Sequence, residues 1–298
     1  HAAEAIAAGK CSVALITLAG RPRAAAKATL PDYDNDTPDT AFETPFNQMI
    51  ANNYAMAAMR HRHEFATTAE QLAWIKVAAS HHAQHNEHAM LRKVVTVEDV
   101  VNSPIISDPL HRLDCCVVSD GGGAIVMVSP EIAKSLGDRC VKVMGQGEAV
   151  KTTNRGQVDL TFTAGVKSGA IAFEEAGLTP ADIDMVMIYD SFTITVLITL
   201  EDLGFCEKGQ GGRFVSDGNL ISGVGKLPFN TDGGGLCNNH PSNRGSMTKI
   251  IEAVRQLRGE AHPRVQVPDC TFALAHGSGG LISTRLCSAT AILGRNDA

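Results

Sequence analysis

The stretch Thr179-Pro-Ala-Asp-Ile-Asp-Met-Val-Met-Ile-Tyr-Asp-Ser-Phe192 combines a helix-start signal, a short apolar run and a polar end. A threonine followed by a proline is typical of the first turn of a helix. The apolar run predicts a buried strand over Met185–Tyr189. A helix that stops at a glycine is expected before it, over residues 164–177, and a second helix after it, over 194–204. Helix, strand and helix in succession are typical of α/β proteins.

The same alternation extends to both sides of this unit. Apolar residues at helical spacing predict an amphipathic helix over 246–258, and residues 209–227 are expected to form a glycine-rich loop. The glycines of Asp120-Gly-Gly-Gly123 favour a tight turn or a close approach of two backbones. Two successive sets of strands and helices predict an α/β fold with a sheet in each half. The further strands are expected over residues 11–19, 113–119, 124–129, 141–144, 270–275 and 289–293.

The segment between the first two predicted strands has a different composition. Residues 31–40 combine turn formers with several carboxylates, as in a solvated loop. Residues 47–62 and 68–85 then show helical spacing. We therefore expect a helical domain inserted over residues 31–110. The remainder of the first half is expected over 1–30 and 111–138, and the second half over 139–298.

Composition limits the classes of function. With 298 residues, 44% hydrophobic and 19% charged, the chain can bury one large core or two ordinary ones, which excludes disorder as its main state. The longest apolar stretch, Thr193–Leu200, is too short to cross a bilayer. A net charge of −6 without a Lys/Arg-rich block disfavours nucleic acid as a partner. Eight scattered cysteines without a Cys-x-x-Cys motif favour a reducing compartment and no structural zinc in this chain. We expect a soluble, cytoplasmic protein with neither a membrane nor a nucleic-acid partner.

The first residues predict only part of a helix. His1–Gly9 is alanine-rich and ends at a glycine, but it has no N-terminal cap and none of the features of a secretory signal. We therefore expect these residues to continue a longer chain.

The most informative polar stretch is Asn230-Thr-Asp-Gly-Gly-Gly-Leu-Cys-Asn-Asn-His-Pro-Ser-Asn-Arg-Gly245. His240 is fixed by the following proline and lies among glycines and asparagines just before a predicted helix. Such a histidine can transfer protons or donate to an oxyanion, and it can equally well tie down loop carbonyls. The glycines match neither nucleotide-binding pattern, Gly-x-x-x-x-Gly-Lys-Ser/Thr or Gly-x-Gly-x-x-Gly.

Other histidines and cysteines have a catalytic and a structural interpretation. His276 is expected directly after a strand, where the amides of Gly277-Ser-Gly-Gly280 could bind an anion. His81, His85 and His88 share one helical face, as metal ligands can, but the His-Glu-x-x-His pattern is absent. We therefore predict no metal site. Cys115-Cys116 lies in an apolar run and is interpreted as core.

Taken together, these stretches resemble the thiolase superfamily, most closely its sterol-carrier-type and thiolase-like bacterial branch. Ser80-His-His-Ala-Gln-His-Asn86 is similar to the loop-domain motif that touches the pantetheine arm of coenzyme A. Tyr189-Asp-Ser-Phe192 stands where thiolases carry Asn-Glu-Ala-Phe or His-Asp-Cys-Phe, and Asn230–Gly245 resembles their Gly-His-Pro motif. The resemblance implies two similar α/β halves in five layers (αβαβα) with an inserted helical loop domain. It also implies a missing N-terminal part whose nucleophilic cysteine precedes His1.

The resemblance also assigns roles to individual residues. His240 matches the histidine that activates the nucleophile, and His276 falls near the second catalytic cysteine or its histidine substitute. Tyr189 replaces the Asn or His of the family motif and Asn239 replaces the glycine of Gly-His-Pro, so the chemistry of this chain can differ. The residues expected to contact the coenzyme A substrate are His82, Ser191, Gly279 and Gly280.

Three functions follow from the resemblance. The leading one is an acyl-CoA thiolase that cleaves a β-ketoacyl-CoA by transferring an acyl group to coenzyme A. The second is a thiolase-like retro-aldolase that cleaves a β-hydroxyacyl-CoA with Tyr189 and His240, and the third is a non-catalytic subunit. The implied partners are coenzyme A as substrate, a second copy of the chain, and a small OB-fold zinc-ribbon protein, so zinc is expected only in that partner.

Overall fold

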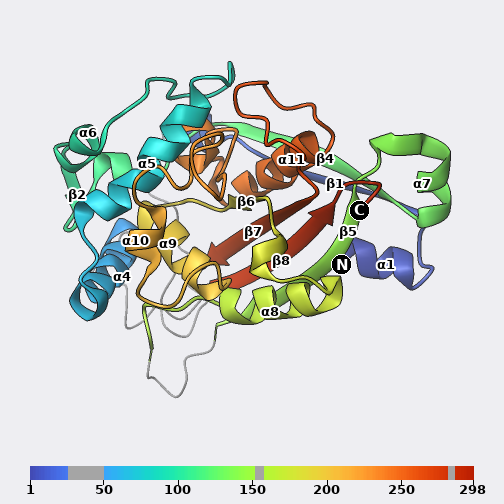
Figure 1. Ribbon diagram of the computed structural model, residues 1–298, viewed down its shortest axis with the longest axis horizontal. Coiled ribbons are helices and arrows are strands. Elements are labelled where there is room, and N and C mark those ends of the chain that lie inside the picture. The colour runs from blue at the N-terminus through green and yellow to red at the C-terminus, as the bar shows by residue number, and fades with distance from the viewer. Residues whose placement is uncertain (26–49, 152–157, 281–285) are drawn as a thin grey trace.

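The computed structural model describes residues 1–25, 50–151, 158–280 and 286–298 (Figure 1). Within these residues the largest sheet has four strands, in which β6 runs parallel to β7 and the other pairs are antiparallel. Their spatial order is β5 (Lys142–Val150), β8 (Leu286–Gly294), β7 (Phe272–Gly280) and β6 (Met185–Ile188). A second sheet pairs β1 (Val13–Gly20) with β4 (Gly121–Val128), and a short hairpin pairs β2 (Ile105–Ser107) with β3 (Leu110–His111).

Helices cover both faces of the four-stranded sheet (Figure 1). Helix α8 (Gly165–Ala176) packs so closely on β5 that a β-carbon on Gly145 or Gly147 would overlap its backbone. Helix α11 (Ser246–Leu257) lies on the opposite face. It also reaches the second sheet, because Ile251 fills the place of a side chain on Gly123 of β4. Helix α11 is therefore enclosed between two sheets, as expected for an α/β protein with a sheet in each half.

A helical region packs on the other side of the molecule from α7 (Pro130–Leu136) and α1 (Ala2–Ala7), and α2 (Pro22–Ala25) follows β1 (Figure 1). Thr68 caps α5 through a capping box with Gln71, whose side chain accepts from the Thr68 N–H at 3.0 Å. The apolar side chains of the five helices named next form one large core with Val186 and Ile188 of β6. The helices are α4 (Ile50–Phe65), α5 (Ala69–Ala83), α6 (Val97–Val101), α9 (Thr193–Asp202) and α10 (Gly211–Val215).

The fold agrees with the α/β prediction, and most predicted elements are present with ends shifted by a few residues. Residues 31–40 lie outside the described residues, so the predicted solvated loop is not described. The limits of the three predicted domains stay a prediction. No helix in the described part of the chain is long and apolar enough to span a membrane.

Three local predictions were wrong or incomplete. Residues 113–119 form no strand, because their N–H groups bond to loops, as from Cys116 to the Ser191 carbonyl at 3.0 Å. The helix expected from Thr179 is a single 3₁₀ turn, Pro180–Asp182. Strand β7 continues to Gly280, so His276 lies within a strand and not after one. The glycines 121–123 make the close backbone approach, since a β-carbon on Gly122 would overlap Ala19 of β1.

Candidate active site

The end of β6 presents a tyrosine to the middle of the molecule. Met185 and Met187 face α11 in the core on that side of the sheet, and alternation along the strand brings Tyr189 to the same face. Asn230 extends the edge of the strand: its amide accepts from the Ile188 N–H at 2.9 Å and donates to the Ile188 carbonyl at 2.8 Å. Tyr189 is therefore fixed at the point where a strand gives way to a loop.

Tyr189 and His240 are in direct contact. The Tyr189 hydroxyl lies 2.6 Å from His240 Nε2, and the ring centroids are 5.2 Å apart. The backbone of His240 is bound twice to Ser119: its N–H donates to the Ser119 hydroxyl at 2.9 Å, and its carbonyl accepts from the Ser119 N–H at 3.4 Å. Two residues 51 positions apart in the chain thus form one hydrogen-bonded pair.

The loop before His240 is held from several sides. Residues Gly234–Asn238 form one π-helical turn after Gly233, whose φ of +97° favours glycine. The carbonyls of this π-helical turn accept hydrogen bonds from Lys76 Nζ at 2.6 Å, from the Leu91 N–H at 2.9 Å and from the Met90 N–H at 3.1 Å. These bonds satisfy buried carbonyls and fix the direction in which His240 leaves the loop.

The shared proton of this pair rests on the phenol. Burial raises the pKa of Tyr189, with smaller contributions from Cys116, Tyr54 and Asp190. Burial lowers the pKa of His240 below its usual range; Asp190 opposes this shift and Lys249 adds to it. At neutral pH the phenol is therefore protonated and the imidazole is neutral, so the 2.6 Å contact joins a donor to an acceptor.

His276 lies on the opposite face of the sheet. Its side chain points toward α8, where a β-carbon on Gly165 would lie 3.4 Å from His276 Cε1, and its Nδ1 is 2.9 Å from the Thr290 hydroxyl. The next residue, Gly277, faces Ser246 of α11. Burial lowers the pKa of His276 to about 4. The Tyr189 N–H donates to the His276 carbonyl at 2.9 Å, but the His276 side chain lies on the other face of the sheet from the side chains of Tyr189 and His240.

The residues predicted along the coenzyme A arm are buried and bonded internally. His82 is 1% exposed; its Nε2 accepts from the Ser222 N–H at 2.9 Å, and burial lowers its pKa to about 4. The Ser191 hydroxyl is 3.0 Å from the hydroxyl of Thr195 in α9. Both side chains tie loops to the helical region in this structure.

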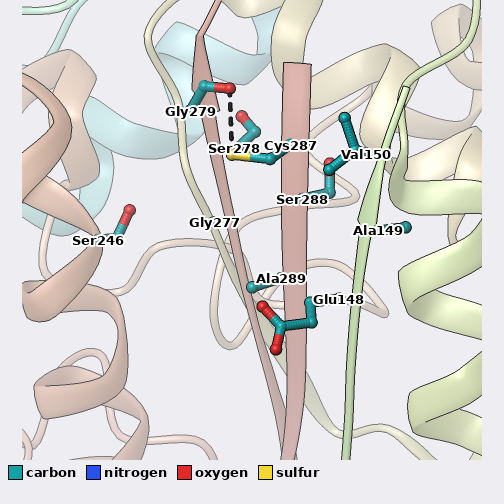
Figure 2. A pocket seen from close by; sticks show the side chains of 10 residues that line it. All are labelled: Glu148, Ala149, Val150, Ser246, Gly277, Ser278, Gly279, Cys287, Ser288 and Ala289. Atoms are coloured by element: carbon teal, nitrogen blue, oxygen red, sulfur yellow. Dashed lines mark hydrogen bonds between the residues drawn. The ribbon is translucent and has the colours of Figure 1, made fainter. Parts of the chain in front are cut away.

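The two predicted glycines lie at the end of β7. Gly279 lines an open hollow of about 470 Å³ that also includes Ser246, Glu148 and Cys287 (Figure 2). The thiol of Cys287 donates to the Gly279 carbonyl at 3.4 Å. Gly280 has a φ of +94°, a conformation that disfavours other residues. The hollow borders the first residue of α11, which follows the loop that carries His240.

The described histidines, cysteines and carboxylates include no group of three arranged to hold a metal ion. Helix α5 ends at Ala83, so His85 and His88 lie beyond it and the three histidines share no helical face. The adjacent Cys115 and Cys116 are half-buried in an extended segment, where burial raises their pKa values to about 11 and 12. They are protonated at neutral pH.

Comparisons with known proteins identify the family and the fold of this chain. The family model for the thiolase C-terminal domain matches residues 147–295. The chain is 38% identical to an acetyl-CoA acetyltransferase from Methanothermobacter thermautotrophicus over 81% of its own length and 63% of the relative. It is 37% identical to a steroid side-chain-cleaving aldolase from Thermomonospora curvata over 76% of its own length and 59% of that relative. It therefore spans about three fifths of each of these two proteins.

Among solved structures, the Ltp2-ChsH2(DUF35) aldolase matches with a TM-score of 0.87 and 34% identity, over 99% of this chain and 75% of that one. The chain belongs to the thiolase superfamily, and it has a thiolase-like fold. Its relatives include both acyltransferases and carbon–carbon lyases.

Proposed function

We propose that the protein is a thiolase-like retro-aldolase that cleaves the Cα–Cβ bond of a β-hydroxyacyl-CoA. The observation that carries the proposal is the 2.6 Å contact between the Tyr189 hydroxyl and His240 Nε2. A retro-aldol cleavage begins with removal of the proton from the β-hydroxyl group, and a phenol backed by a neutral imidazole can perform it.

The proton moves in a relay. Tyr189 accepts the proton of the substrate β-hydroxyl while its own proton passes to His240 Nε2, so no free phenolate is required although burial raises the pKa of the phenol. The Cα–Cβ bond breaks, Cβ becomes a carbonyl carbon, and the electron pair of the bond forms the enolate of the shortened thioester. Return of a proton to Cα releases the acyl-CoA.

The contact between Tyr189 and His240 also favours retro-aldol cleavage over acyl transfer as the reaction of this protein. In a thiolase the histidine must serve a cysteine thiolate. Here His240 Nε2 is already bonded to a phenol. The likeness to two aldolases supports the same choice.

The second candidate is the acyl-CoA thiolase. It is supported by the 38% identity to an acetyl-CoA acetyltransferase and by the place of His240 in a Gly-His-Pro-like loop. It requires a nucleophilic cysteine, which the family resemblance places before His1.

Partners and location stay proposals as well. A protein partner is supported by the structural neighbour, an aldolase in which Ltp2 is paired with ChsH2(DUF35). That such a partner is a small OB-fold zinc-ribbon protein stays a prediction from the sequence. A homodimer and a cytoplasmic location remain predictions from the sequence. A non-catalytic role remains the third candidate, and turnover of an acyl-CoA by the isolated protein, with loss of that activity on His240→Ala, would exclude it.

The experiment compares the requirement for free coenzyme A. A β-hydroxyacyl-CoA and the matching β-ketoacyl-CoA are each incubated with the protein, with and without added coenzyme A, and products are separated by mass. An aldolase releases a carbonyl compound and a shorter acyl-CoA from the hydroxy substrate without added coenzyme A. Cleavage of the keto substrate only, and only with coenzyme A, supports the thiolase instead.

A further inference from the structure

A buried ion pair lies directly behind the Tyr189–His240 contact. Asp190 is fully buried and Lys249 is 2% exposed; the lysine Nζ lies 2.9 Å from Asp190 Oδ1. The carboxylate also accepts the Gly235 N–H at 2.7 Å and the Leu236 N–H at 3.1 Å. Lys249 Nζ makes no hydrogen bond of good geometry to any described group, so this carboxylate is its ionic partner. Removing either charge alone leaves the other buried without a partner.

A single glycine separates this pair from His240. A β-carbon built on Gly235 would lie 3.0 Å from Asp190 Oδ1 and 3.1 Å from His240 Cδ2. The carboxylate and the imidazole therefore face each other across one backbone unit. Across so short a distance in a buried setting, charge on the pair acts on the ring with little screening.

Among the residues that the structure describes, the other polar groups around His240 place no compensating charge close to the ring. Tyr189, at the end of β6, is a neutral phenol, and Ser119 and Cys116 in the extended segment contribute a hydroxyl and a protonated thiol. Arg244, in the same loop, extends over Gly20 of β1. Asp190 from the end of β6 and Lys249 from α11 are the charges that shift the pKa of His240, and their directions are opposite.

We propose that Asp190 and Lys249 are positioning residues for His240. The carboxylate holds residues 234–240 against Tyr189, and the ammonium group cancels its charge, so that the imidazole stays neutral and accepts the phenolic proton. This inference deepens the proposed function and rests on it for its catalytic meaning. Lys249 acts through Asp190 and His240, and neither Lys249 nor Asp190 touches the substrate.

The test removes one charge at a time with side chains of similar shape. Lys249→Met leaves the anion alone, so His240 should hold a proton to higher pH and the acid limb of kcat/KM should move up in pH. On the order of tenfold activity should be lost at a pH below the shifted limb. Asp190→Asn should move the limb the other way. In the double variant, the acid limb of the kcat/KM profile should return close to its wild-type pH. If Asp190 and Lys249 were purely structural, combining the two substitutions would not restore the profile.

A second readout does not depend on turnover. The pH at which half of the His240 imidazole is protonated, its titration midpoint, can be followed in the full chain by NMR of labelled histidine. The signal is assigned from a His240→Gln variant. The midpoint should rise in Lys249→Met, fall in Asp190→Asn and return in the double variant. Lys167→Met on the exposed side of α8 is the matched control, and thermal unfolding identifies variants that fail to fold.

These measurements separate this inference from the proposed function. If the wild-type chain cleaves no acyl-CoA but the midpoints move in opposite directions, the proposed function fails and the charge balance stands. If the midpoint of His240 is the same in the wild type and in all three folded variants, the inference is overturned, whatever the activity.

Discussion

The hydroxyl of Thr290 lies 2.9 Å from Nδ1 of His276, on the α8 side of the four-stranded sheet. The Tyr189–His240 pair is on the α11 side, so the two imidazole rings lie on opposite faces of the sheet. Thr290→Val removes the partner of a buried imidazole and is expected to lower the free energy of unfolding by about 1–3 kcal/mol. Chemical denaturation measures this loss. The folded variant should keep its kcat/KM; a large fall in kcat/KM without loss of stability would place His276 in the chemistry.

Two buried histidines predict how stability depends on pH. Burial lowers the pKa values of His82 and His276 to about 4, from 6.5 in an unfolded chain. Between these values the unfolded state binds protons that the folded state does not. Stability is therefore complete above about pH 6.5 and falls as the pH is lowered toward 4, by up to about 1.4 kcal/mol per unit and per group.

Denaturation curves at several pH values test this dependence. His276→Asn removes one of the two groups, so its stability should fall less steeply between pH 6.5 and 4 than that of the wild type. The same slope in both proteins would argue that His276 is not buried and neutral.

Gly234 has no room for a side chain. A β-carbon there would overlap the Asp190 carboxylate, and its φ of +61° disfavours any other residue. Gly234→Ala should therefore cost at least about 2 kcal/mol of stability and displace the loop that carries His240. Gly259→Ala is the matched control: its φ is +68°, but no atom lies within 4 Å of the added carbon. Equal costs for the two variants would contradict the close packing of Gly234 on Asp190.

The pH–rate profile should reflect His240. Because burial holds the pKa of this imidazole below its usual range, activity should be constant through neutral pH and fall only when the pH drops through that lowered value. Steady-state kcat/KM from pH 4.5 to 8 tests the prediction. An acid limb at or above pH 7 would mean that the imidazole is not the proton acceptor.

Much of the fold could be predicted from the sequence because its signals are local. The apolar run 185–189 and the glycine stop after Ala176 need only neighbouring residues to be recognised. The strand expected over 113–119 failed because its backbone partners, such as the Gly235 carbonyl, come from distant loops. The glycine-rich residues 277–280 suggested a turn, whereas pairing with β8 keeps them in a strand.

The candidate site was predictable in part. His240 was chosen from its surroundings, and the family resemblance assigned Tyr189 its role and named both residues for the aldolase alternative. Local patterns do not reveal the contact between them. Lys249 was missed because a lysine next to the apolar Ile250 and Ile251 usually marks the solvated face of a helix. Helix α11 is enclosed by two sheets, so Lys249, Glu252 and Gln256 are buried while Ile250 and Ile251 are only half-buried.

We propose that Tyr189 and His240 act as one proton relay in carbon–carbon cleavage. The most direct measurement is kcat/KM of Tyr189→Phe for a β-hydroxyacyl-CoA without added coenzyme A, beside Tyr54→Phe, which removes another buried phenol. We expect kcat/KM to fall about 100-fold or more for Tyr189→Phe and much less for Tyr54→Phe. Undiminished cleavage by a folded Tyr189→Phe variant would contradict this proposal.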